Sequence, residues 1–224
     1  MLSKRTFLHA VLIAGALACA PVLAQKKSNS EFAKLLKKGD PFTKQDPEVM
    51  KKLGIESYGP FPWADHITTA DIDKVLGEKR VLWMETKHFR IGLNLKTSPL
   101  PEDSKERKAL QRECASLNKI CRKIPSKARK LGPWLRLHLY ARRCEQAYEQ
   151  FAQFVGVTDK TFDPKSKVVG RGPYLGLPDK YLLLLFQKKS DMARYMSRYC
   201  ETDADDSMRF YHQKTGQLVL AISQ

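Results

Sequence analysis

The amino-acid sequence predicts an α+β fold: one mixed β-sheet with a long αα-hairpin inserted into it, in the order β-β-α-α-β-α-β-β. Three observations predict this class. Residues 88–95 alternate between apolar and polar, 104–124 and 134–155 carry apolar residues every three or four positions, and 181–186 is continuously apolar. The 224 residues are 42% hydrophobic, which is enough for a core. This composition excludes collagen-like and disordered chains.

Residues 1–24 are predicted to be a signal peptide. A basic start and an apolar run over 7–18 lead to Ala24, a residue typical of the position before a cleavage site. This run is too short to span a bilayer, and no later run reaches the roughly 18 apolar residues of a membrane span. We therefore expect a secreted or periplasmic protein without a transmembrane span. The alternative is a lipoprotein that is cut before Cys19 and lipidated there.

Residues 25–68 are predicted to form an extended N-terminal segment with short helices. Apolar residues at helical spacing indicate one helix over 31–38 and another before Gly54. Prolines and glycines interrupt the rest of the segment, which favours turns. We therefore expect this segment to wrap around residues 69–224, which form a single α+β domain.

Each element of residues 69–224 has a local signal. Thr69 begins a short helix that Gly77 ends. The continuous apolar run over 181–186 is typical of a strand that is buried on both faces of a sheet. The other predicted elements are strands over 81–86 and 88–95, a helix over 190–200, and a hairpin with strands 208–212 and 217–222.

The predicted αα-hairpin consists of helices over 104–124 and 134–155 with a proline-containing loop between them. If the helices pack antiparallel, Cys114 and Cys144 face each other on the apolar seam, so a disulfide between them is predicted. A Cys121–Cys200 disulfide then follows by elimination, because exported proteins favour paired cysteines. The alternative is that all four are free, small core residues.

Positive charge is concentrated in the hairpin. The chain has 40 Lys and Arg against 24 Asp and Glu, and residues 104–143 hold thirteen of the bases and only two acids. Such a face attracts polyanions, so we expect an acidic polysaccharide, an anionic lipid or an envelope component as partner. Nucleic acid is disfavoured because no aromatic residue interleaves with the bases, and a merely solvated face is the alternative. The predicted anion-binding patch comprises Lys105, Arg107, Lys108, Arg112, Lys119, Arg122, Lys123, Lys127, Arg129 and Lys130.

No catalytic, metal or cofactor site is predicted. The histidines after residue 24 occur in neither an H-E-x-x-H helix nor an H-x-H pair, so we expect packing or surface roles for them. Gly170, Gly172 and Gly176 precede a strand, whereas a dinucleotide-binding loop follows one, so they indicate a turn. Residues 201–206 lack the spacing of a calcium loop. The histidines are His66, His88, His138 and His212.

The succession of elements resembles the N-terminal half of exported bacterial proteins related to the gluzincin (peptidase MA-like) metallopeptidases. The resemblance spans roughly residues 80–222. In that family the last strand leads to an H-E-x-x-H helix that binds zinc and activates water. The resembling stretches are Glu85–Ile91, the helix containing Ala141–Phe154, the strand in Lys180–Phe186, and Phe210-Tyr211-His212.

The chain departs from this family because it has no zinc motif, so no zinc ligand or catalytic Glu carries over to any residue. The resemblance leaves two readings: a non-catalytic relative, or the front part of a zinc peptidase-like protein whose H-E-x-x-H helix would follow Gln224. The apolar strand Leu218–Ile222 favours the second reading if it forms an exposed sheet edge, because finished proteins normally cover such edges.

Overall fold

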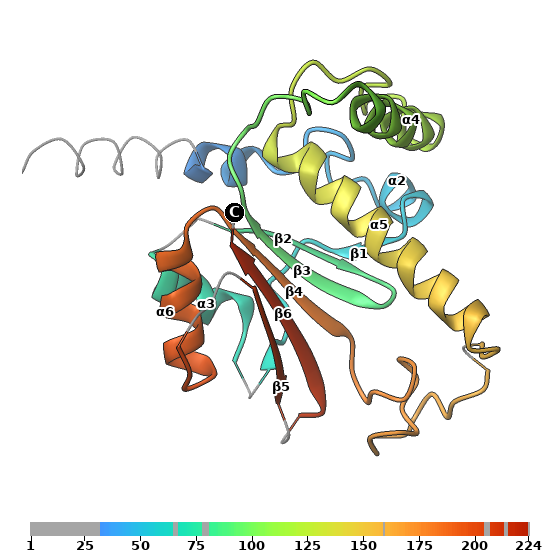
Figure 1. Ribbon diagram of the computed structural model, residues 1–224, viewed down its shortest axis with the longest axis vertical. Coiled ribbons are helices and arrows are strands. Elements are labelled where there is room, and N and C mark those ends of the chain that lie inside the picture. The colour runs from blue at the N-terminus through green and yellow to red at the C-terminus, as the bar shows by residue number, and fades with distance from the viewer. Residues whose placement is uncertain are drawn as a thin grey trace, which may run out of the picture.

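The computed structural model describes residues 32–64, 67–77, 81–158, 160–203, 207–212 and 215–223, so the predicted signal peptide and Cys19 lie outside the described residues. The described part contains a six-stranded sheet in the order β1-β2-β3-β4-β6-β5 (Figure 1). β4 pairs in parallel with β3 and β6, whereas the other neighbours are antiparallel. The predicted α+β class with a mixed sheet is confirmed. The strands are β1 (Ile55–Ser57), β2 (Leu82–Thr86), β3 (Phe89–Asn94), β4 (Tyr181–Phe186), β5 (Ser207–His212) and β6 (Gln217–Ser223).

Helices cover both faces of the sheet. α5 lies on one side together with α2 and α4, and α3 and α6 lie on the other (Figure 1). No helix in the described part of the chain is long and apolar enough to cross a membrane. The helices are α2 (Pro47–Lys52), α3 (Thr69–Leu76), α4 (Ser104–Ile120), α5 (Pro133–Phe154) and α6 (Lys189–Tyr199), and residues 32–38 are also helical.

The short helix α3 has the predicted bounds. The backbone N–H of Thr68 donates a hydrogen bond to the Asp71 carboxylate at 2.9 Å, which pairs a helix N-terminal donor. The helix ends at Gly77, whose φ of 91° is left-handed and favours a residue without a Cβ.

Strand β4 is buried on both faces, as its sequence predicts. Leu182 and Leu184 belong to the core beneath α3 and α6. Leu183 and Leu185 belong to the core beneath α5, because successive side chains of a strand point to opposite faces. The single strand therefore supplies both hydrophobic cores.

The last apolar strand, β6, is not an edge. It lies between β4 and β5, and Leu220 and Ala221 are in register with β4 on one side and with β5 on the other. The expectation of an exposed edge at Leu218–Ile222 is wrong, because β5 pairs antiparallel with β6 and covers that side. The reading of a shortened chain loses the argument that rested on this edge.

The N-terminal segment is part of the sheet and of its cores. β1 pairs with β2 through Ile55 and Thr86. Phe61 and Trp63 belong to the core beneath α3 and α6. Phe32 belongs to the core beneath α5.

Helices α4 and α5 cross each other: Figure 1 views α4 almost end-on, while α5 runs across the picture. Leu110 and Leu117 of α4 pack with Leu135 and Leu139 of α5 in a third cluster. The predicted apolar stripe of α5 is wrong at its C-terminal end, where Phe151 is 54% exposed. This end has no sheet beneath it, since α5 extends past the β-strands (Figure 1).

The four described cysteines are free, so the structure does not contain the predicted disulfides. Cys114 is buried between α4 and α5, whereas Cys144 packs against the core between α5 and the sheet. The neighbouring residues Glu113 and Arg143 do meet, at 2.8 Å, so the two helices approach here while the two cysteines pack into different clusters. Cys121 and Cys200 lie in clusters on opposite faces of the sheet, which separates the second pair.

Candidate functional site

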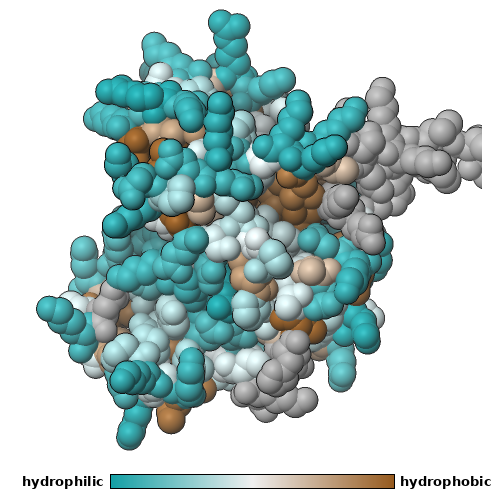
Figure 2. Space-filling model, turned by 180° about the vertical axis from the view of Figure 1, so that it is seen from behind, coloured by the Kyte–Doolittle hydropathy of each residue, from teal (hydrophilic) through white to brown (hydrophobic). Residues whose placement is uncertain are grey.

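All ten residues of the predicted anion-binding patch are exposed. Figure 2, which views the molecule from behind, shows hydrophilic side chains projecting from the end of the molecule that carries α4. Four of them form one stripe of α4, because they are spaced by three, four and seven residues. This stripe lies opposite the buried stripe that contains Leu110, Cys114 and Leu117. The basic stripe comprises Lys105, Lys108, Arg112 and Lys119.

The basic stripe is not neutralised by the described part of the chain. None of its four side chains forms an ion pair or hydrogen bond with another described residue. Arg107 differs from them, because its guanidinium donates hydrogen bonds to the carbonyl oxygens of Pro101 at 3.0 Å and Glu102 at 2.7 Å. The four side chains of the stripe therefore lack a partner among the described residues, whereas Arg107 binds its own loop.

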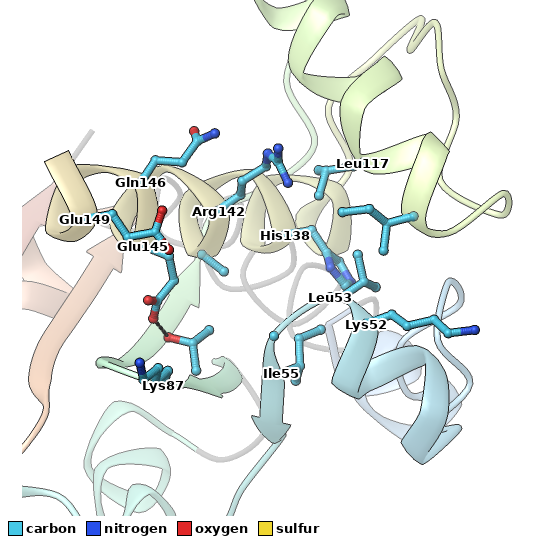
Figure 3. A pocket seen from close by; sticks show the side chains of 14 residues that line it. Lys52, Leu53, Ile55, Lys87, Leu117, His138, Arg142, Glu145, Gln146 and Glu149 are labelled. Atoms are coloured by element: carbon cyan, nitrogen blue, oxygen red, sulfur yellow. Dashed lines mark hydrogen bonds between the residues drawn. The ribbon is translucent and has the colours of Figure 1, made fainter. Parts of the chain in front are cut away.

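A cleft of about 340 Å³ lies beside α5 (Figure 3). The other walls are the connection from α2 to β1, the turn between β2 and β3, and the C-terminal end of α4. Leu53, Ile55 and Leu117 give it an apolar part, and Lys52 and Lys87 lie on its wall. The side chains that α5 contributes are His138, Ala141, Arg142, Glu145, Gln146 and Glu149.

His138 is held by a buried carboxylate. Its Nε2 lies 2.9 Å from Asp40 Oδ2, and the two side chains are 2% and 0% exposed. Asp40 also accepts hydrogen bonds from the hydroxyl groups of Tyr58 at 2.6 Å and Thr43 at 2.7 Å, and from the backbone N–H of Phe42 at 3.0 Å. These donors compensate for burying the charge, which would otherwise be costly.

The charge state of Asp40 determines the tautomer of His138. Burial alone would raise the pKa of Asp40, but the hydrogen bond and charge of His138, with donors from Tyr58 and Phe42, hold it well below its usual range. An ionised carboxylate only accepts hydrogen bonds, so Nε2 of His138 carries the proton in the pair. When the ring is neutral, Nδ1 is therefore the nitrogen with a free lone pair.

A second acid–histidine pair lies next to the cleft. Glu145 Oε1 accepts hydrogen bonds from the Thr86 hydroxyl at 2.6 Å and the His88 backbone N–H at 3.0 Å, and Oε2 lies 2.6 Å from His88 Nδ1. The His88 ring stacks on Tyr148 with 3.7 Å between ring centroids. Although burial acts to raise it, the pKa of Glu145 is lowered by these hydrogen bonds. Glu145 thus anchors the β2–β3 turn to α5.

The remaining sequence-predicted residues do not join the cleft. His212 is buried at the end of β5 and contacts the Phe210 ring. Gly170 and Gly172 form a turn, in which a Cβ on Gly172 would lie 2.1 Å from the Leu177 carbonyl oxygen. His66 and residues 204–206 lie outside the described residues. The described residues include no group of three or more His, Cys, Asp or Glu that could hold a metal ion.

Sequence reasoning missed the cleft, although part of its signal was present. His138, Arg142, Glu145 and Glu149 are spaced by four, three and four residues, which places them on one stripe of α5. Asp40 had no such signal, because Gly39-Asp40-Pro41 reads locally as a helix stop. Its partner His138 is 98 residues away in the chain.

No protein-family model, no curated protein and no solved structure matches the chain.

Proposed function

We propose that the chain is an exported, non-catalytic α+β domain that binds an anionic surface through a basic helical hairpin. In this proposal α4, α5 and their connection, residues 104–143, are the hairpin inserted between β3 and β4. The binding surface is an acidic polysaccharide, an anionic lipid or another envelope component. Export rests on the N-terminal pattern of residues 1–24.

One observation carries the proposal: Lys105, Lys108, Arg112 and Lys119 form an exposed stripe that no described residue pairs. Acids are nearby, but Glu113 pairs with Arg143 at 2.8 Å instead. Unpaired charges of one sign produce a field that raises the local concentration of polyanions. Lys119 leads on to exposed bases of the α4–α5 connection, which extend the surface that a polymer can follow.

The chemistry favours a surface over base-specific recognition. α4 contains no aromatic residue, so the stripe offers no platform on which bases can stack. Lysine and arginine side chains on an exposed helix face suit repeated carboxylate, sulfate or phosphate groups. Such binding weakens steeply as salt rises, because exposed charges are screened.

The test compares two four-site variants of the purified protein. One variant changes the basic stripe to glutamine (K105Q, K108Q, R112Q, K119Q). The matched control changes four exposed bases before β4 (K160Q, K165Q, K167Q, R171Q) and removes the same net charge. The probes are polygalacturonate, vesicles with anionic lipids, and duplex DNA, each at several salt concentrations.

We expect the stripe variant to lose about a thousandfold in affinity for polygalacturonate or anionic vesicles at low salt, because each of its four bases contributes about 1 kcal/mol near an anionic surface. The control should lose much less. Equal losses in both variants would show that net charge alone acts, and would overturn the assignment to α4. Tightest binding to DNA would overturn the proposed surface in favour of nucleic acid.

A further inference from the structure

The cleft beside α5 has a histidine nitrogen that the protein itself does not use. His138 is 3% exposed and lines the cleft. Asp40 occupies Nε2, whereas Nδ1 has no hydrogen-bond partner among the described residues. Nδ1 is not completely buried, and His138 is one of the residues that line the cleft. An unpartnered ring nitrogen at the wall of a cleft is suited to a hydrogen bond with a ligand's hydroxyl group.

The other groups of the cleft define the ligand's charge. Arg142 lies on the α4 side of α5, and Lys52 lies on the α2 side (Figure 3). Neither forms an ion pair with another described residue. Of the two acids, Glu145 is directed at Thr86 and His88, so Glu149 is the acid that offsets part of this positive charge. The cleft therefore favours a ligand with one negative group.

The remaining groups define the rest of the ligand. Gln146 and Glu149 lie on the same wall and supply acceptors and donors for hydroxyl groups. Leu53, Ile55 and Leu117 offer an apolar surface for C–H groups. The volume of about 340 Å³ is at the small end of the range for small-molecule sites, which suits one sugar-sized molecule.

We propose that this cleft binds a small hydroxylated carboxylate of the sugar-acid class, with its carboxylate near Arg142 and a hydroxyl group hydrogen-bonded to Nδ1 of His138. Asp40 acts as a positioning residue, because it binds Nε2 of His138 and so leaves Nδ1 for this hydrogen bond. The site is separate from the basic stripe of α4. We expect the cleft to bind a single small molecule, whereas the stripe binds an extended anionic surface.

The test follows the His138 side-chain nitrogens by NMR of histidine-labelled protein during addition of sodium glucuronate. We expect the Nδ1 resonance of His138 to shift with a saturable dependence up to about 10 mM glucuronate. Glucose, which lacks the charge, and acetate, which lacks the hydroxyl groups, should each bind at least about tenfold more weakly. Equal binding of glucose would overturn the assignment of an anionic ligand.

The variants separate binding from folding. Because replacing His138 also disrupts the buried Asp40 pair, the informative change is Arg142→Gln, with Arg143→Gln as the neighbouring control on the same helix. Arg142→Gln should weaken glucuronate binding about tenfold or more, and Arg143→Gln should leave it unchanged. Equal affinities in these two variants, or no shift of His138 in the unmodified protein, would overturn the proposal.

The same measurements keep this site distinct from the proposed function. The stripe variant K105Q, K108Q, R112Q, K119Q should bind glucuronate as the unmodified protein does, because its four residues do not line the cleft. Arg142→Gln should retain binding to polygalacturonate or anionic vesicles. Loss of both activities in either variant would show one shared site and overturn the cleft as a separate one.

Discussion

The two faces of the sheet are covered in different ways. On one face α3 and α6 cover a mainly apolar layer, in which Trp63 Nε1 donates a hydrogen bond to the hydroxyl group of Tyr195 at 2.9 Å. On the other face α5 and the N-terminal segment bury two acid–histidine pairs, Asp40–His138 and Glu145–His88. The same strands supply both faces, so the difference comes from the covering elements.

The comparison shows what a buried carboxylate requires. Asp40 accepts hydrogen bonds from Thr43 in its own turn, from Tyr58 just after β1 and from His138 of α5. The pKa of Asp40 is lowered. Asp73 of α3 has fewer partners: Trp83 Nε1 donates to it at 3.0 Å, and burial raises its pKa to about 6. Burial alone disfavours a charge, and only a prearranged set of donors reverses this. The candidate cleft lies on the face that has such a set.

The largest expected effect on stability comes from changing Asp40 on the face of the sheet beneath α5. Asp40→Asn replaces one carboxylate oxygen with an NH2 group, which must face either the Phe42 N–H or the donors that share Oδ2. It also removes the charge of the buried pair, so we expect it to lower the free energy of unfolding by about 3–5 kcal/mol. Urea denaturation followed by circular dichroism measures this. Glu102→Gln, an exposed acid in a loop, is the control and should change it by less than about 0.5 kcal/mol. A loss below about 1 kcal/mol for Asp40→Asn would mean that the pair contributes little.

A smaller effect is expected from overpacking the apolar face. A Cβ on Gly92 would lie 2.4 Å from Trp83 Cζ3 and 2.7 Å from Leu184 Cδ2. Gly92→Ala should therefore lower the free energy of unfolding by about 1–3 kcal/mol. Gly132→Ala is the matched control, since a Cβ there meets nothing within 4 Å. If both variants were equally stable in urea, the packing of the α3–α6 face would be looser than described.

The pH dependence sharpens the contrast, because the two carboxylates have opposite shifts. Asp73 has a raised pKa in the folded state, so its protonated form favours folding and stability falls as pH rises from about 4 to about 6. Asp40 has a lowered pKa, so its contribution is present above about pH 4 and is lost as pH falls further.

The measurement is the difference in urea stability between the unmodified protein and Asp73→Asn at several pH values. This difference should change between about pH 4 and 6 and stay constant above, with the unmodified protein losing stability as pH rises. The opposite slope would show that Asp73 is stabilised as a charged group, as Asp40 is.

The smallest effect on stability is expected from the basic stripe of α4. Its residues are exposed and have no described ion-pair partner, so K105Q, K108Q, R112Q, K119Q should change the free energy of unfolding by less than about 0.5 kcal/mol. Urea denaturation beside the binding assay tests this. A loss above about 1 kcal/mol would show that the stripe stabilises the fold, which the exposure of its side chains does not predict.

Several elements were predictable from the sequence because their signals are local. The apolar alternation of 88–95 indicated β3, and the continuous run over 181–186 indicated a strand buried on both faces, as β4 is. Thr69 and Gly77 marked the ends of α3. The same holds for the exposed bases of α4, because a helical period assigns each residue to a face.

Relationships between distant segments were decided only by the tertiary structure. The sheet places β6 between β4 and β5, which no local pattern of Leu218–Ile222 shows. Cys114 and Cys144 pack into different hydrophobic clusters, although their positions along the helices suggested a pair. Packing in three dimensions sets these distances, whereas a periodic pattern reports only which side of an element is buried.

The sequence by itself determined the class of the fold, most of its elements and the position of its positive charge, since each depends on spacing within one segment. The tertiary structure decided the strand order, the clusters in which the cysteines pack and the candidate cleft. Asp40 meets His138 across 98 residues of chain, and Glu145 meets His88 across 57. A buried charge needs donors from several segments at once, and only the folded chain brings those segments together.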